Sequence, residues 1–421
     1  MTDVEIHQRL ELLLGLGLGF LESGQSTGQT SRTLAACAEA LGLPDAQLDI
    51  LGSRVTVEHI SADGAVSHAR GRASSIDVID SARLRELSRV VLEIERGEAD
   101  PERTTARIER IRASRTPWWW STAGLVMLAF FISLQVGTGW DAWLTAAGVQ
   151  LVSATAAALA GRFGMPRLFA ATLQTVLSGL VAILLADAGL VQPAGAAAAL
   201  AVAWLLILPL PQLIEAITDA VEGEYVAALT RIANVGITAG GIVIGASVVL
   251  YVGGALDLAH SGALELPDMP WYLGLVFAAL GAIGNAIANG GQASLILPAA
   301  MLGVVTSASS QLLHLTDLHP GWANSIAAVL LGFVAVFLAG WIKYPYQVLA
   351  LMGITGALLP GITVFRGILR EMSGSSGVEF FAQAGTTCVG LGVGVAFGVY
   401  FAVLTSAKRV RAQVAPPVRR R

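Results

Sequence analysis

The chain has only two cysteines in 421 residues, and this scarcity excludes two kinds of protein. Cys37 lies in the charged N-terminal region, and Cys388 lies in an apolar segment near the other end. Two such distant cysteines cannot form a disulfide framework, and neither belongs to a CxxC pair that could hold zinc. We therefore expect neither a disulfide scaffold nor a metal site.

Charged residues are also scarce, at 13% against the roughly one quarter of an ordinary soluble domain, while 54% of residues are apolar. Residues 1–116 hold most of the charges, and residues 117–407 hold few. This division predicts a soluble N-terminal α+β domain followed by a membrane region. The first ten residues, MTDVEIHQRL, lack the basic start of a signal peptide, so we expect no cleaved leader.

Signatures of nucleotide chemistry and catalysis are missing as well. The glycines of the apolar region have neither a preceding strand nor a following lysine, both of which a phosphate-binding loop requires. No obvious nucleophile motif accompanies His59 and His68 in the N-terminal region. We expect a protein that is not an enzyme, needs no cofactor and binds no nucleic acid.

The N-terminal region has the apolar spacing of four helices and of alternating strands. The helices are predicted at 4–22, 27–42, 81–97 and 101–115, with strand-like patterns over 48–60 and 65–74. The last helix is rich in arginine and leads into Trp118, Trp119 and Trp120. A basic flank beside a tryptophan cluster is typical of the cytoplasmic side of a membrane span.

Ten apolar segments follow, in two sets of five. They are predicted at 118–137, 141–160, 167–187, 193–210, 225–252, 271–288, 293–313, 320–341, 345–360 and 380–405. With the N-terminus inside, the inner loops contain Arg162, Arg167 and Lys343, and residues 408–421 form a basic inner tail. The excess of Lys and Arg predicts a multi-pass protein of the plasma membrane with both termini in the cytoplasm. Only Arg366 and Arg370 break the rule.

These two arginines belong to an internal repeat. The stretch LILPLPQLIEAITDAVEG ends the fourth segment, and ALLPGITVFRGILREMSG ends the ninth. Aligning their prolines places Glu215 opposite Arg366 and Asp219 opposite Arg370, so the apolar frame is kept and the charge is inverted. Because an odd number of spans reverses orientation, the pattern predicts a 5+5 inverted repeat with halves 117–256 and 268–407.

The charged residues of the two stretches are the main functional candidates. Glu215 and Asp219 are four residues apart on one helical face, and their mutual repulsion suits a proton-coupled carrier. Arg366 and Arg370 have the same spacing and could hold a substrate carboxylate. The alternative is that all four are solvated ends of membrane helices. Glu222, a fifth charged residue in the first stretch, is the one for which we favour this solvated interpretation.

Two amides are further candidates for substrate contact. Asn285 and Asn289 share a helical face and stand in the glycine-interrupted stretch ANGGQ. Such interruptions mark the binding sites of many carriers. Hydrogen bonds between helices are the alternative, because an amide inside a membrane needs a partner.

At this point the chain resembles the threonine/serine exporter family of bacterial and fungal membrane proteins. The likeness is carried by LLLGLGLGFLESGQSTGQTSRTLAACAEALGL, LPLPQLIEAITDAVEGEYVAALTRI and LLPGITVFRG, and it extends from about residue 5 to 405. The motif positions are Pro209, Pro211, Gly223, Pro360, Gly361, Thr363, Arg366 and Gly367. The chain departs from the family where Leu210 and Pro211 follow Pro209.

The resemblance implies proton-driven export of threonine and serine through ten spans that follow a cytoplasmic domain. On this basis Thr363 joins Arg366, Arg370, Asn285 and Asn289 as candidates for substrate binding. Two alternatives stay open. Split-chain relatives resemble dicarboxylate exporters, so the substrate could be a small organic acid such as succinate. The helices could also anchor an enzyme or sensor formed by residues 1–116. A homo-oligomer is compatible with either reading.

Overall fold

The structure, a computed structural model, describes residues 2–61, 64–76, 79–135, 139–255, 270–316, 318, 320–357, 363, 366–367, 370 and 375–405. Of the sequence predictions, Pro360 and Gly361 lie outside these residues. So does the basic tail 408–421.

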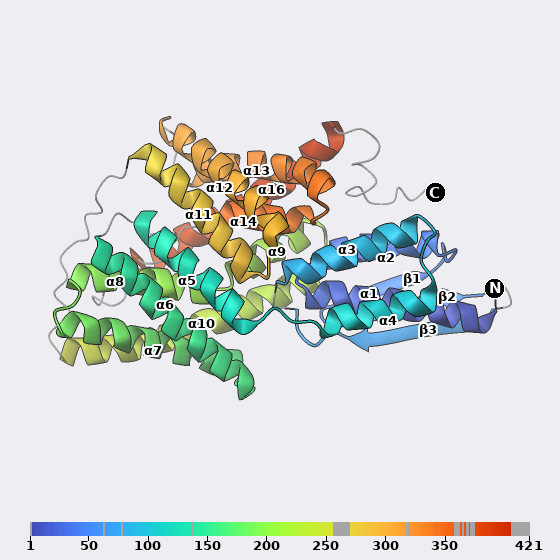
Figure 1. Ribbon diagram of the computed structural model, residues 1–421, viewed down its shortest axis with the longest axis horizontal. Coiled ribbons are helices and arrows are strands. Elements are labelled where there is room, and N and C mark those ends of the chain that lie inside the picture. Colours follow the sequence, from blue (N-terminus) through green and yellow to red (C-terminus); the bar gives the residue numbers. More distant parts are fainter. Residues whose placement is uncertain are drawn as a thin grey trace.

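Four helices and a small antiparallel sheet form the first part of the chain, called here the N-terminal unit (Figure 1). Its elements are α1 (Asp3–Glu22), α2 (Thr27–Ala40), β1 (Gln47–Leu51), β2 (Arg54–Ile60), β3 (Val66–Arg72), α3 (Ser81–Glu95) and α4 (Pro101–Ala113). The sheet order is β1-β2-β3, with Val55 paired to Ile50 on one side and Gly71 on the other. All four helices agree with the predicted segments to within two residues.

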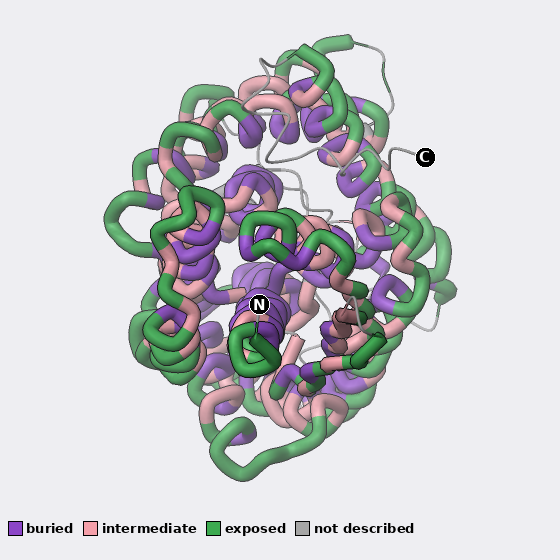
Figure 2. Tube along the Cα trace, turned by 90° about the vertical axis from the view of Figure 1, so that its right-hand side faces the viewer, coloured by how far each residue is buried: buried purple, intermediate pink, exposed green. Residues whose placement is uncertain are grey.

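Helix α1 is the centre of the N-terminal unit. It packs against α2, α3 and α4 and against strands β2 and β3, so apolar residues on every side of it are buried. Seen end-on in Figure 2, α1 is buried over most of its length behind the N-terminus. Its glycines allow close approach, since a Cβ on Gly17 would lie 2.9 Å from Leu34 and 3.2 Å from Val55. The run LLLGLGLGFL is therefore the core of this unit.

Eleven further helices of the described residues form a bundle beside this unit (Figure 1). They are α5 (Trp118–Gln135), α6 (Trp140–Arg162), α7 (Arg167–Asp187), α8 (Pro193–Ile207), α9 (Leu210–Val221), α10 (Tyr225–Ala255), α11 (Trp271–Ala288), α12 (Ala293–His314), α13 (Pro320–Ile342), α14 (Tyr346–Ala357) and α16 (Val378–Thr405). Ten of them fall on the ten predicted apolar segments. The extra one, α9, carries the carboxylates of the first proline motif.

The bundle is that of a polytopic α-helical membrane protein. Seven helices of the described residues are long and apolar enough to cross a bilayer, and up to nine spans result if two bent helix pairs count as one each. Helix α14, with 12 residues, rises only about 18 Å and is too short to cross about 30 Å of hydrocarbon. Figure 2 shows buried residues on the inner sides of the helices and exposed ones on the outer sides, where large apolar side chains are frequent.

The two halves of the bundle pack their helices in the same pairs. In the first half α6 contacts α5, α7 and α8, while α7 also contacts α8 and α10. In the second half α12 contacts α11, α13 and α14, while α13 also contacts α14 and α16. Each of these five contacts in the first half therefore has a counterpart at the same position of the second half.

The first helices of the two halves, α5 and α11, run antiparallel. Near the start of α5, Gly124 touches the backbone of Ala288 at the end of α11. Farther along α5, the ring of Phe131 stacks on Phe277 near the start of α11, with centroids 6.4 Å apart. From the first of these contacts to the second, the residue number rises along α5 and falls along α11. The two helices therefore run in opposite directions.

The helices on the third and fifth predicted apolar segments of each half run parallel. Gly241 and Gly245 of α10 lie against Leu168 and Thr175 of α7, so both numbers rise together. Helices α13 and α16 show the same order in the contacts Gly394–Ser325 and Gly398–Val329. Two parallel helices need a returning segment between them, and the described helices between these pairs are α8 and α9 in the first half and α14 in the second.

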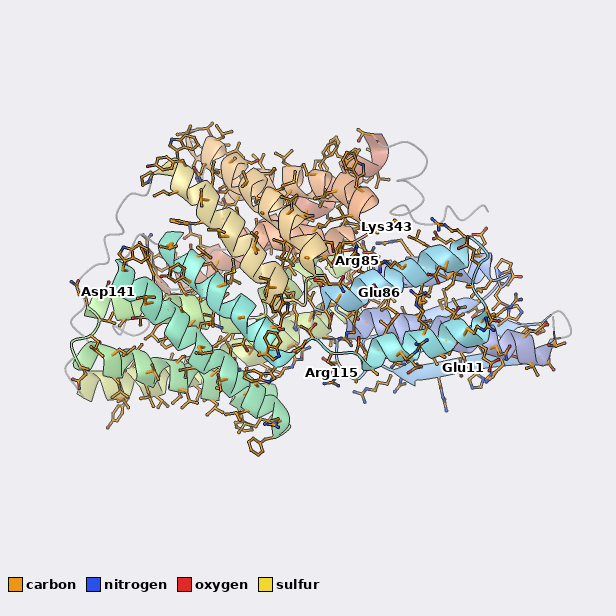
Figure 3. The ribbon with its side chains drawn as sticks, in the orientation of Figure 1. Glu11, Arg85, Glu86, Arg115, Asp141 and Lys343 are labelled. Atoms are coloured by element: carbon orange, nitrogen blue, oxygen red, sulfur yellow. The ribbon has the colours of Figure 1, made fainter. Side chains whose placement is uncertain are left out.

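The end of the bundle that touches the N-terminal unit is called the near end. Figure 3 labels Arg85, Arg115 and Lys343 at this junction and Asp141 at the opposite end of the bundle. Helix α11 finishes at the near end, where the backbone oxygen of Asn289 accepts a hydrogen bond of 2.8 Å from the N–H of Ser81. Basic residues thus gather where the N-terminal unit sits.

The close packing of α5 against α11 depends on the missing side chain of Gly124. We expect Gly124→Ala to lower the free energy of unfolding by about 1–3 kcal/mol, because its Cβ would overlap the backbone of Ala288, which cannot yield as a side chain can. Gly148→Ala on α6 is the matched control, since a Cβ there meets nothing within 4 Å. Thermal unfolding in detergent measures both, and equal midpoints for the two variants would contradict this packing.

Candidate functional site

A bend in the first half of the bundle positions the predicted carboxylates. Helices α8 and α9 meet at an angle of 42° around Pro209. Pro211 stands in the first turn of α9, where its missing N–H leaves no hydrogen bond unmade. The helix ends at Gly223, whose φ of +89° favours glycine. The backbone N–H of Glu224 then donates to the backbone carbonyl oxygen of Asp219 at 2.8 Å, and the N–H of Gly223 donates to the backbone oxygen of Ala220.

Glu215 and Asp219 share the face of α9 that packs on α10, and both bind Arg231. The guanidinium Nε donates to Asp219 Oδ2 at 3.0 Å, and Nη1 donates to Glu215 Oε2. Asp219 is fully buried and Arg231 is 2% exposed. A guanidinium held between two carboxylates accounts for their placement on one face, because it offsets the repulsion between like charges.

The turn between α1 and α2 completes this buried cluster. The backbone oxygen of Gln25 accepts from Arg231 Nη2 at 3.2 Å. The backbone N–H of Thr27 donates to Asp219 Oδ1 at 3.2 Å. Thr27 is the first residue of α2, so the positive end of that helix dipole also faces the Asp219 carboxylate. A segment far away in the sequence is thereby fixed on the α9–α10 corner.

A second ion pair lies beside the first. Arg32 of α2 donates to Glu222 Oε1 at 2.7 Å. The prediction that Glu222 is solvated was wrong, because the N-terminal unit covers it, and a Cβ on Gly28 would collide with its carboxylate. Burial lowers the pKa of Arg32, but the hydrogen bond and the charge of Glu222 outweigh that effect and raise it.

The N-terminal unit binds the start of this turn through Glu22 and Ser23. Glu22 accepts from the Arg112 guanidinium at 3.0 and 3.1 Å and from the Ser74 N–H at 2.9 Å. Burial raises the pKa of Glu22, yet the bonds from Arg112 and Ser74 prevail, and its pKa lies below the ordinary 4.5. Arg83 donates to the Glu22 backbone oxygen at 2.9 Å, and the Asp80 N–H bonds the Ser23 oxygen at 3.2 Å.

The two asparagines of the second half lie at another junction with the N-terminal unit. The Asn289 amide donates to the Asn285 backbone and side-chain oxygens at 2.8 Å each, and Asn285 donates to the Leu351 oxygen at 3.4 Å. Asn289 also accepts from Ser81. The structure thus gives these amides partners between helices and from the N-terminal unit, and their role in substrate contact stays a prediction.

Next to the asparagines, Arg85 of α3 reaches across to α12. It donates to Gln292 Oε1 at 3.0 Å and to Ser294 Oγ at 2.7 Å, and its guanidinium lies 5.0 Å from the centre of the Tyr344 ring. The N-terminal unit therefore contacts both halves of the bundle.

The late proline motif is described at four of the predicted positions. Thr363 is half-buried, Gly367 is buried against Phe380 and Phe381, and Arg366 and Arg370 are exposed. The Arg370 guanidinium lies 5.7 Å from the centre of the Phe380 ring. The ion pairs of Asp219 and Glu215 are with Arg231 and not with these arginines, so the structure does not assemble the two charged motifs into one cluster among the described residues.

Sequence reasoning missed Arg231 and Arg32 as partners of the carboxylates. Arg231 did carry a signal, because it is an arginine inside the predicted apolar segment 225–252, where an isolated charge is costly and needs a counter-charge. Its spacing of 12 residues from Asp219 fits a helix that turns back on the next one. Arg32 gave no such signal, since it lies in a charged region.

The family can be decided with this geometry in hand. Residues 11–253, more than half of the chain, match the family model described as "Putative threonine/serine exporter". The chain belongs to this family. The matched range contains the α1–α2 turn, both carboxylates and Arg231, which is every residue of the buried cluster. Membership makes this chain a multi-pass membrane transporter rather than an enzyme.

Two relatives match nearly the whole chain. The "Probable threonine/serine exporter" of Mycobacterium tuberculosis is 26% identical over 96% of this chain and 78% of its own length. The "Threonine/serine exporter" of Corynebacterium glutamicum is 25% identical over 93% of this chain and 82% of its own length. No solved structure matches the chain.

Arg231 is the residue on which the cluster depends most. We expect Arg231→Gln to lower the free energy of unfolding by about 3–5 kcal/mol, because it leaves Asp219 buried without its counter-charge. Adding Asp219→Asn to this variant should recover part of the loss. The control is Arg162→Gln, at an exposed arginine of α6. Thermal unfolding in detergent compares the three, and equal losses for the two arginines would refute the ion pair.

Proposed function

We propose that the protein exports threonine and serine across the plasma membrane as a secondary active transporter coupled to protons. The observation that carries the proposal is the charge of the buried cluster. The carboxylates of Glu215, Asp219 and Glu222 face the guanidiniums of Arg231 and Arg32, which leaves one negative charge uncompensated. A buried excess charge requires a cation, and a proton on Glu215 or Asp219 supplies it.

The cluster also bears on the choice of substrate. An amino acid brings an ammonium group that the excess carboxylate attracts. A dicarboxylate such as succinate brings two negative charges, which the same cluster repels. The names of the two relatives agree with an amino-acid substrate. Threonine and serine are therefore the substrates of the proposal, and succinate is the comparison in its test.

Ten spans in a 5+5 inverted repeat form the proposed architecture. The proposed parts are a cytoplasmic domain of residues 1–116, halves 117–256 and 268–407, and the tail 408–421. Matching helix contacts in the two halves support a repeat, and the antiparallel course of α5 and α11 supports its inversion. The parallel pairs α7–α10 and α13–α16 support a returning span between their members.

The orientation of the proposal follows from charge. Arg115 precedes α5, Arg162 ends α6, Arg167 begins α7 and Lys343 follows α13. Figure 3 labels Arg115 and Lys343 at the near end, and these basic residues fit a cytoplasmic location for this end and for the N-terminal unit. Helix α16 runs parallel to α13, so it also finishes at the near end. Both termini are then cytoplasmic. Thr363, Arg366, Arg370, Asn285 and Asn289 remain predictions for substrate contact on the path through the bundle.

Asp219 is the residue that tests proton coupling. In proteoliposomes loaded with threonine, an inward proton gradient should accelerate efflux, and one pH unit is worth about tenfold in the final threonine ratio for each coupled proton. We expect Asp219→Asn to abolish this dependence, because an amide does not take up a proton in this range. Asp187→Asn, at the exposed end of α7, should leave it intact.

Two outcomes would count against the proposal. Threonine efflux that ignores the gradient in the unaltered protein would remove proton coupling. Efflux of succinate without efflux of threonine or serine, measured in the same vesicles, would replace the substrate.

A further inference from the structure

The buried cluster holds two backbone groups that resemble the two ends of an amino acid. Arg231 donates to a carbonyl oxygen, that of Gln25, where a substrate carboxylate would accept. Asp219 accepts from an N–H, that of Thr27, where a substrate ammonium would donate. The side chains of Arg231 and Asp219 are themselves 3.0 Å apart, so the Gln25 oxygen and the Thr27 N–H are bound side by side. An α-amino acid presents these two groups from a single carbon.

We propose that Arg231 and Asp219 form the binding site for the carboxylate and ammonium of the transported amino acid, and that residues 25–27 occupy this site as an internal surrogate until substrate displaces them. The inference rests on the proposed function, because it names the substrate contacts of an amino-acid exporter. It assigns a new role to the N-terminal unit, whose α1–α2 turn becomes a competitor of the substrate.

Burial makes the site selective for charge. Asp219 is 0% exposed, Arg231 2%, and the turn residues Gln25 and Thr27 are 4% and 2% exposed. Water is therefore excluded from the groups that face one another, and an ion pair in such surroundings is stronger than at a surface. A ligand with both charges is favoured over one that carries only a carboxylate or only an ammonium.

Replacement of the turn by substrate is favourable on chemical grounds. A carboxylate accepts more strongly from a guanidinium than a neutral carbonyl does, and an ammonium donates more strongly than an amide N–H. The turn compensates through its covalent attachment, which gives it a high effective concentration. The bound turn also leaves one polar atom unsatisfied, because Gln25 Oε1 is buried without a hydrogen-bond partner among the described residues. These opposing effects allow exchange.

Substrate and proton would then compete for the same carboxylates. A proton on Asp219 removes the charge that would hold the substrate ammonium, and an ammonium bound to Asp219 opposes protonation of the same carboxylate. Such mutual exclusion at one site is what exchange of an outgoing amino acid for an incoming proton requires. The charged groups around Asp219 are Glu215 on α9, Glu222 just after α9, Arg231 on α10 and Arg32 on α2. Glu224 lies outside these ion pairs, and its charge acts on Arg32.

Thr27→Pro is a specific way to weaken the surrogate. Thr27 is the first residue of α2, a position that tolerates proline, and Ser26 before it has φ −63° and ψ 152°, which proline permits in its predecessor. The substitution removes the N–H that binds Asp219 and leaves the helix intact. Thr27→Ala is the matched control, because it removes the side chain and keeps the N–H.

Binding of L-threonine in detergent gives the first readout. We expect the Kd of Thr27→Pro to be lower than that of the unaltered protein by roughly fivefold, the effect of one lost hydrogen bond in the competitor. Thr27→Ala should leave the Kd near the unaltered value. Threonine methyl ester and N-acetylthreonine, which lack one of the two charges, should fail to bind. Equal Kd values for both variants, or weaker binding by Thr27→Pro, would overturn the proposal.

Hydrogen exchange in the unaltered protein gives a second readout that needs no variant. Adding L-threonine should increase deuterium uptake in residues 23–30, because the turn leaves its seat. If the protein exports threonine while this uptake stays constant, the surrogate is refuted and the proposed function stands. If threonine displaces the turn but is not exported, the proposed function fails and the binding site stands.

Discussion

The structure depends on one buried guanidinium. Arg231 is held by Asp219 and Glu215 on α9 and by the backbone oxygen of Gln25 in the α1–α2 turn. An arginine two turns into an apolar helix is costly unless every donor finds a partner, and here the partners come from the preceding helix and from the N-terminal unit. One side chain therefore fixes the α9–α10 corner and seats a distant segment on it. These ion pairs leave the corner with two carboxylates on one guanidinium.

The N-terminal unit is tied to both halves of the bundle by different interactions. The α1–α2 turn and Arg32 bind the α9–α10 corner of the first half, while Ser81 and Arg85 bind the α11–α12 connection of the second. Any change in the angle between the halves must break or carry along one of these contacts. In an alternating-access carrier, the unit is thus placed to respond to the state of the bundle and to influence it.

Local patterns predicted the elements of this fold well. Apolar periodicity located α1 to α4 and the ten apolar helices, since helix spacing and span length are written in consecutive residues. Helix α9 was not among the predicted segments, although Pro211 and Gly223 fix its first turn and its end. Span number was harder, since α8 and α14 are short, and helix length and composition give seven to nine candidate spans among the described residues.

The contacts of the site were not predictable in the same way. The sequence placed Glu215 and Asp219 on one face, but their environment is set by Gln25 and Thr27, about 200 residues away in the chain. Glu222 was misjudged for this reason, because no local pattern shows that α2 covers it. Two features of the sequence did point to the site. Two carboxylates at that spacing repel one another and need a cation, and a single arginine, Arg231, in an apolar helix needs a counter-charge. Each anomaly resolves the other.

The most direct test of the account is the distance between the N-terminal unit and the bundle with and without substrate. Spin labels at Arg103→Cys on α4 and Phe163→Cys after α6 report it, since both positions are exposed and the native Cys37 and Cys388 are buried. Substrate that displaces the turn should shift part of the population to a new distance when L-threonine is added, and Asp219→Asn should remove that response. A single unchanged distance at saturating threonine, in a protein that exports it, would contradict the central role given to this contact.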